Sequence, residues 1–174
     1  IFTSMSLIAE EEFHITFNEE NAKNWRYISD RTMGGISTGQ AVLEKDGDIF
    51  FARLTGNVST ENNGGFIQLR SNLSFINLNK GGKKLKGVRL NVRGNGETYH
   101  IFIRTNETRS YSDFYSATFI AKSKWEIIDL PFTKFKRTFL DTKLEGKDIR
   151  IFAIVAYGRD FLSDVSVSNI NFYY

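Results

Sequence analysis

Residues 87–104 read GVRLNVRGNGETYHIFIR, and this stretch decides the fold class. Apolar and polar side chains alternate strictly through 88–93, and in the second run Tyr99, Ile101 and Ile103 alternate with His100, Phe102 and Arg104. A period of two is typical of β-strands that bury one face and expose the other. Turn-forming residues at Gly94–Gly96 separate the two runs and predict a hairpin that joins them.

The same alternation recurs along the chain. It is present in residues 13–17 and 115–119. The run Ile149–Ala156 is continuously apolar except for Arg150, which predicts a central strand covered on both faces. Near the C-terminus the apolar parity changes between Val167 and Ile170, which predicts a bulge that keeps both sides of the change in the core. We therefore predict an all-β fold of about eight to ten strands, an antiparallel β-sandwich or jelly roll.

The chain has 174 residues, enough for one domain with a substantial core, and no repeat or linker divides it. We predict one domain at residues 13–174. Residues 1–12 are interpreted as a signal-peptide remnant or a disordered N-terminal segment, with a first strand as the alternative for the apolar IFTSMSLIA at 1–9. The side chains expected between the two sheets are Val88, Leu90, Val92, Tyr99, Ile101, Ile103, Ile151, Ile154 and Trp125.

Composition excludes several classes of function. The absence of Cys excludes disulfides, thiolate zinc sites and Cys nucleophiles. A net charge of +3 is too mild to indicate nucleic acid, and the lysines of 80–86 are interpreted as a solvated loop. The sequence contains no run of 18 apolar residues, so no transmembrane helix is predicted. Asp46 and Asp48 are interpreted as turn-forming residues, and the alternative is that their carboxylates bind calcium. We predict no metal and no cofactor.

The segment GISTG at residues 35–39 matches the G-x-S-x-G pattern of hydrolases. A nucleophilic serine there requires a following helix and a nearby histidine base, whereas strands are predicted to follow, and the two histidines, His14 and His100, lie in predicted strands. We predict that the chain is not an enzyme and that Ser37 is structural. The glycines next to Met33 are expected to form a tight bend, with Trp25 and Met33 packed beneath it.

Residues 25–37, WRYISDRTMGGIS, resemble the W-x4-D-x2-MGG-x-S signature of the complex I intermediate-associated protein 30 family. Similar family features follow in order at 61–70, 93–99 and 125–135, so that the resemblance covers residues 13–172. The residues assigned to this structural motif are Trp25, Met33, Gly34, Gly35, Ser37, Gly64, Gly65, Phe66, Trp125, Pro131 and Phe132.

The resemblance implies a galactose-binding-like β-sandwich without an established enzyme activity. The family is best known for a mitochondrial assembly factor, or chaperone, of respiratory complex I, and it has many bacterial members. A non-catalytic binding or assembly-factor domain with a protein partner is therefore expected. The alternative is a carbohydrate- or small-ligand-binding module of the cell envelope, which an exported, periplasmic location would favour; such a location is preferred here over a cytoplasmic one.

The motif blocks contain more Gly, Asn, Arg and Asp than core strands require. One interpretation is that they are turns that hold the sandwich together. The functional interpretation is that six of their residues and neighbours gather on one exposed face, where several guanidinium groups would favour an anionic or carboxylate-bearing target. These predicted site residues are Asp30, Arg31, Asn63, Arg70, Arg93 and Arg104.

Overall fold

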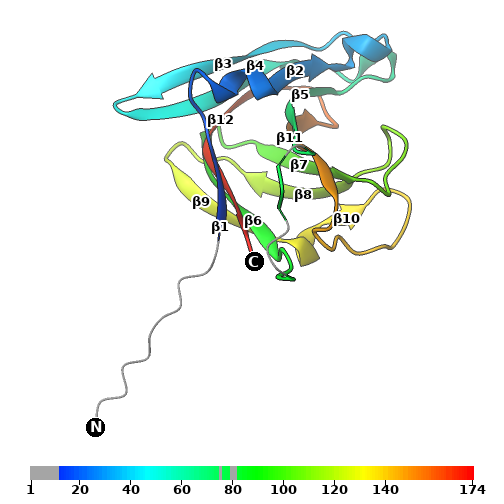
Figure 1. Cartoon of the computed structure of the whole chain (residues 1–174). Coiled ribbons are helices and arrows are strands. Elements are labelled where there is room, and N and C mark those ends of the chain that lie inside the picture. The colour runs from blue at the N-terminus through cyan, green and yellow to red at the C-terminus, as the bar shows by residue number, and fades with distance from the viewer. Residues whose placement is uncertain (1–11, 75, 79–81) are drawn as a thin grey trace.

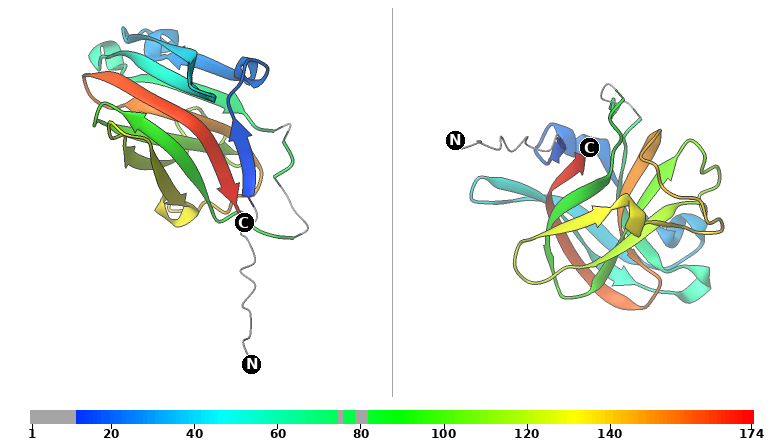
Figure 2. Two further views of the ribbon diagram at one scale, coloured as in Figure 1. Left: turned by 90° about the vertical axis from the view of Figure 1, so that its left-hand side faces the viewer. Right: turned by 90° about the horizontal axis from the view of Figure 1, so that it is seen from below.

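Two six-stranded antiparallel sheets pack face to face, as Figures 1 and 2 show for the computed structural model, which describes residues 12–74, 76–78 and 82–174. Sheet A has the order β3 (Thr38–Asp46), β4 (Ile49–Val58), β12 (Phe161–Tyr173), β6 (Gly87–Gly94) and β9 (Glu126–Pro131), and β1 (Glu12–Thr16) pairs with the end of β12. Sheet B has the order β10 (Lys136–Arg137), β8 (Tyr115–Ile120), β7 (Thr98–Thr105), β11 (Ile149–Tyr157), β5 (Phe66–Asn72) and β2 (Trp25–Ser29).

The helical content of the described residues is limited to four short 3-10 turns. They are η1 (Asn21–Asn24), η2 (Asp30–Met33), η3 (Glu61–Asn63) and η4 (Phe132–Lys134). The predicted antiparallel β-sandwich is confirmed, with more strands than the alternation alone indicated. No helix among the described residues combines the length and the hydropathy needed to span a bilayer. The segment IFTSMSLIA and residues 79–81 of the lysine-rich loop lie outside the described residues.

The core between the sheets follows the period-two pattern. Val88, Leu90 and Val92 of β6 face Tyr99, Ile101 and Ile103 of β7 across the sandwich, and all six side chains are inaccessible to solvent. The register of β12 shifts between Val167 and Asn169, and this bulge lets residues on both sides of it enter the core, as predicted.

The hairpin predicted at Gly94–Gly96 is wrong. β6 belongs to sheet A and β7 to sheet B, so this segment crosses from one sheet to the other. Alternation identifies strands but not their pairing partners, and consecutive strands of a sandwich often lie in opposite sheets. The crossing is fixed by backbone hydrogen bonds from Gly94 N to Lys122 O and from Gly96 N to Ala121 O, both 2.7 Å.

Two predicted core residues are only half-buried. Trp125 lies on the outer face of sheet A, where its ring contacts Phe51 at 5.4 Å between centroids and the Arg93 guanidinium at 4.7 Å. Its aromatic surface is covered there by neighbouring side chains rather than by the opposite sheet. Ile151 follows a register shift in β11 that turns it out of the alternation of the core.

Tyr99 anchors the crossing between the sheets through its buried hydroxyl. The hydroxyl donates to Asn95 Oδ1 at 2.7 Å and accepts from the Asp164 backbone N–H at 2.8 Å, and burial raises the pKa of this phenol to about 12. We expect Tyr99→Phe to lower the free energy of unfolding by about 1–3 kcal/mol, because the hydroxyl and its two partners lose partly buried hydrogen bonds. Urea denaturation of the variant measures this change. Tyr157→Phe, at an exposed tyrosine, is the matched control, and equal midpoints for the two variants would contradict the expectation.

Candidate functional site: a groove on the outer face of sheet B

A groove of about 430 Å³ runs over the face of sheet B that points away from sheet A. The side chains of its floor are the outward-facing residues of the period-two strands β5 and β7, on either side of β11. The residues that line it are Ile28, Thr32, Met33, Asn63, Gly64, Phe66, Gln68, Arg70, Phe102, Arg104, Tyr111, Ser112, Phe114 and Tyr157.

The groove has an apolar floor that is separate from the core between the sheets. Ala153 and Val155 of β11 are buried on this outer face, and they cluster with Phe66, Phe102 and Phe114. Phe102 and Phe114 are stacked, with ring centroids 3.9 Å apart and an interplanar angle of 22°. An outer sheet face that carries an apolar cluster beneath a concavity is suited to hold a ligand rather than only water.

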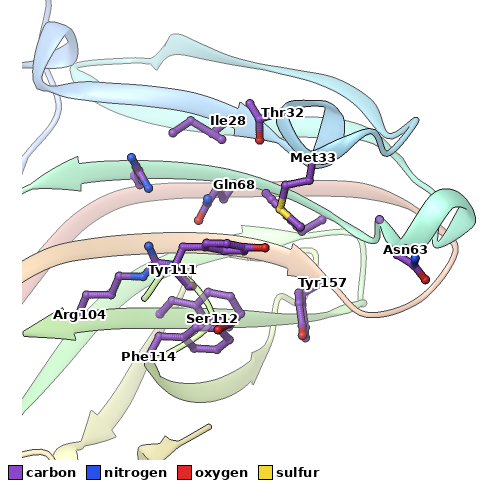
Figure 3. A pocket seen from close by; sticks show the side chains of 14 residues that line it. Ile28, Thr32, Met33, Asn63, Gln68, Arg104, Tyr111, Ser112, Phe114 and Tyr157 are labelled. Atoms are coloured by element: carbon purple, nitrogen blue, oxygen red, sulfur yellow. Dashed lines mark hydrogen bonds between the residues drawn. The ribbon is translucent and has the colours of Figure 1, made fainter. Parts of the chain in front are cut away.

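Two irregular segments form opposite walls above this floor. Figure 3 shows Thr32 and Met33 of η2 on one side and Tyr111 with Ser112 on the other, with Gln68 between them. The Tyr111 side chain is 64% exposed and that of Met33 is 45% exposed, although both are large and apolar over most of their surface. The groove therefore presents aromatic and thioether surface to solvent at its rim.

The wall at η2 is held in place by the buried carboxylate of Asp30, which is fully inaccessible to solvent. One oxygen accepts from Ser37 N at 3.0 Å, and the other accepts from the Ser37 hydroxyl at 2.5 Å and from the backbone N–H groups of Gly65 at 2.6 Å and Phe66 at 3.2 Å. These bonds connect the η2 bend to the entrance of β5.

Glycines in two of the segments that resemble the family, residues 25–37 and 61–70, make room for this carboxylate. A Cβ at Gly35 or at Gly64 would overlap the Asp30 side chain, and Gly34 ends η2 with a φ of +89°, which favours glycine. The predicted glycine bend is thus present. The expectation that Met33 packs beneath the bend is wrong, because Met33 points into the groove, and Trp25 packs instead against Phe17 in the core.

Ser37 is placed for structure and not for catalysis. Its side chain is inaccessible to solvent, and its hydroxyl, besides donating to Asp30, accepts from Ser59 N at 3.0 Å. A hydroxyl committed in this way cannot reach a substrate. No cluster of three or more His, Asp or Glu side chains suited to a metal ion is found among the described residues.

The six predicted site residues do not share one face. Asn63, Arg70 and Arg104 line the groove. Asp30 lies buried behind its wall, and Arg31 is exposed with its Nε donating to the Ser37 carbonyl at 3.1 Å. Arg93 lies on the outer face of sheet A beside Trp125 and forms an ion pair with Asp46 at 3.4 Å. The structure therefore brings Arg70 and Arg104 together and separates Arg93 from them.

Comparison with known proteins identifies the family of the chain. The sequence model of the family described as Complex I intermediate-associated protein 30 (CIA30) matches residues 15–158. The chain belongs to this family. A curated relative, an uncharacterized protein of Schizosaccharomyces pombe, is 27% identical over 136 residues, which are 71% of this chain and 61% of the relative. The chain thus spans less than two thirds of that relative's length.

Solved structures confirm the fold of this CIA30 chain. A family 11 carbohydrate-binding module of the Clostridium thermocellum cellulase Lic26A-Cel5E has a TM-score of 0.69 and 16% identity, covering 94% of this chain and 95% of the module. The structure of the family 11 module from Clostridium thermocellum in complex with a β-1,3-1,4-mixed-linked tetrasaccharide has a TM-score of 0.66 and 16% identity, with coverages of 91% and 94%. At this level of identity the likeness concerns the β-sandwich.

Proposed function

We propose that this CIA30 domain is a non-catalytic binding module and that the groove on sheet B is its binding site. The observation that carries the proposal is the groove itself: a concave outer sheet face with a buried aromatic floor and a rim that exposes Tyr111 and Met33. Its volume of about 430 Å³ falls within the range of ligand sites. The one serine in a hydrolase-like pattern is buried and hydrogen-bonded, which supports the non-catalytic part of the proposal.

A short stretch of a carbohydrate chain is the occupant that the geometry of the groove favours. Aromatic rings cover the apolar faces of sugars, and the amides of Gln68 and Asn63 supply donors and acceptors for hydroxyl groups. The same sandwich fold occurs in a carbohydrate-binding module in complex with a mixed-linked tetrasaccharide. The backbones of β5, β11 and β7 are paired on both sides, so an extended peptide would find no free strand edge on this floor.

The second candidate occupant is a segment of a partner protein, as the family's link to complex I assembly suggests. The exposed Met33 and Tyr111 favour it, because a methionine and an aromatic at a groove rim suit the apolar side chains of a polypeptide. The two candidates share the groove and differ in what fills it.

A truncation at the rim tests the site. We expect Tyr111→Ala to weaken binding of the best ligand from a microarray of oligosaccharides about tenfold or more, because an exposed aromatic ring is lost from the contact surface. Ile127→Ala, at an exposed apolar residue of β9 on sheet A, is the control and should bind as the unaltered chain does. Binding that survives Tyr111→Ala but not Ile127→Ala would place the site elsewhere, and a microarray without any bound oligosaccharide would favour the protein partner.

A further inference from the structure

One end of the groove carries a cluster of four arginines from four different segments of sheet B. Arg26 on β2 and Arg70 on β5 are directly opposite each other in the strand register. Arg104 comes from β7, and Arg150 comes from the start of β11. Arg70 and Arg104 line the groove, and the four guanidinium groups are close enough for Arg70 to experience the charges of Arg26 and Arg150, and Arg104 those of Arg70 and Arg150.

A bulge brings Arg150 into this cluster. The register between β11 and β7 shifts between Ile149 and Ile151. Ile149 and Phe152 both belong to the core between the sheets, so the two residues between them are left to the outer side of the strand. A regular strand would place only one residue there, and Arg150 is the additional one.

The cluster lacks the carboxylates that neutralise arginines elsewhere in the described part of the chain. Among the described residues, none of the four arginines forms an ion pair with an Asp or Glu. Arg104 and Arg150 donate instead to the carbonyl groups of Tyr111 and Thr108, and the Arg150 Nε is buried without an acceptor. The paired arginines are Arg53 with Asp164, Arg89 with Glu12, Arg93 with Asp46, Arg137 with Asp113, and Arg159 with Glu97.

The surroundings of the cluster leave its positive charge uncompensated. Burial and the neighbouring guanidinium groups lower the pKa of Arg70 and that of Arg104. Asp113 attracts Arg104, but both of its carboxylate oxygens already accept from Arg137, each at 2.8 Å. Half-buried like charges repel one another, and an anion between them relieves this repulsion while accepting paired hydrogen bonds from a guanidinium fork.

The outward-facing side chains of β5 change in chemistry along the strand, and this order fits a longer ligand that carries an anionic group at one end. Arg70, Gln68 and Phe66 point in turn into the groove, so charge, amide and aromatic surface follow one another over about 13 Å. Resting on the proposed carbohydrate-binding function, we infer that the ligand is an acidic oligosaccharide, with a carboxylate of one sugar bound by Arg70 and Arg104 and the following sugars on the aromatic part of the groove.

Isothermal titration calorimetry with three ligands of matched length tests this inference. The ligands are tetragalacturonate, the neutral galactotetraose and tetraglutamate. We expect tetragalacturonate to bind at least tenfold more tightly than the other two. Arg70→Gln and Arg104→Gln should each weaken its binding by about tenfold to a hundredfold, because a charge-assisted hydrogen-bonded pair is lost, and Arg70→Lys should retain part of the affinity. Arg93→Gln, which removes an arginine on sheet A, should leave binding unchanged.

Each alternative outcome separates the inference from the proposed function. Equal binding of the acidic and neutral sugars, sensitive to Tyr111→Ala, would retain the carbohydrate groove and overturn the anion site. Tighter binding of tetraglutamate would replace the sugar by an acidic polypeptide and overturn the inference. If none of the three ligands binds, the inference fails, and the oligosaccharide microarray alone decides whether the groove binds carbohydrate. Arg70→Gln should also leave the melting temperature unchanged or higher, since it removes repulsion, and a clear decrease would mean that the cluster is structural.

Discussion

Removal of the Asp30 carboxylate by Asp30→Ala is expected to lower the free energy of unfolding by about 3–5 kcal/mol. Four donors, from Ser37, Gly65 and Phe66, lose a charged acceptor in a place that water does not reach. The measurement is urea denaturation followed by circular dichroism. Glu44→Ala is the control, because Glu44 is partly exposed, pairs with Arg53 at 3.5 Å, and should contribute no more than about 1 kcal/mol.

The Asp30 carboxylate should also make the free energy of unfolding depend on pH in the acidic range. Burial by itself raises the pKa of Asp30, but the hydrogen bonds from Ser37, Gly65 and Phe66 outweigh burial and hold this pKa below its ordinary value. A lowered folded-state pKa stabilises the protein above the unfolded-state pKa, about 3.9 for Asp, and this contribution is lost as the pH falls through the folded-state value. Stability of the unaltered chain should therefore fall more steeply below about pH 4 than that of Asp30→Ala. Parallel pH profiles for the two proteins would contradict the assignment.

Asp30 also explains why the signature blocks of the family are glycine-rich. It is bonded to the entrance of β5 and packed against Gly35 and Gly64, so the two blocks form one buried unit. That unit positions Met33 and Asn63 on the wall of the groove. The interpretation of these blocks as structural corners and the interpretation as a functional surface are therefore compatible: the glycines and Asp30 build the wall, and neighbouring side chains face the groove.

The fold could be predicted from the sequence because alternation is a local property. Each side chain in a run such as 99–103 faces the core or the outside according to its parity, and the structure confirms this for Tyr99, Ile101 and Ile103. Strand pairing is not local, and for this reason the hairpin assigned to Gly94–Gly96 is wrong. The prediction of Trp125 in the core is wrong for a related reason: hydrophobicity does not distinguish the inner face of a sheet from a covered outer face.

The site could be predicted only where it follows the same parity. Arg104 faces outward with Phe102 because both alternate with core residues of β7, and an outward Phe in that position was a usable signal of an apolar outer face. Tyr111 lies in an irregular segment, where no periodicity indicates direction. Arg150 is the one polar residue of the run 149–156, but the sequence does not show that a bulge there turns it to the outer face beside Arg70 and Arg104.

The second large effect is expected in the core, where Phe152 joins the two sheets. Its side chain is inaccessible to solvent, and its ring meets Trp25 of sheet B edge-on at 6.4 Å and Phe172 of sheet A edge-on at 5.7 Å between centroids. Phe152→Ala removes both aromatic contacts and leaves a cavity between the layers. We expect the free energy of unfolding to fall by about 3–5 kcal/mol, measured by denaturant titration.

Two companion variants make this expectation specific to packing between the sheets. Phe152→Leu retains most of the apolar volume and should recover a large part of the lost stability, because the cavity is smaller. Ile120→Ala, at a half-exposed residue on the end of β8, should change stability by no more than about 0.5 kcal/mol. If Phe152→Ala were no more destabilising than Ile120→Ala, the aromatic contacts through Phe152 would not be what holds the two layers together. In that event the stability of the sandwich would have to come from the aliphatic rows of β6 and β7 instead.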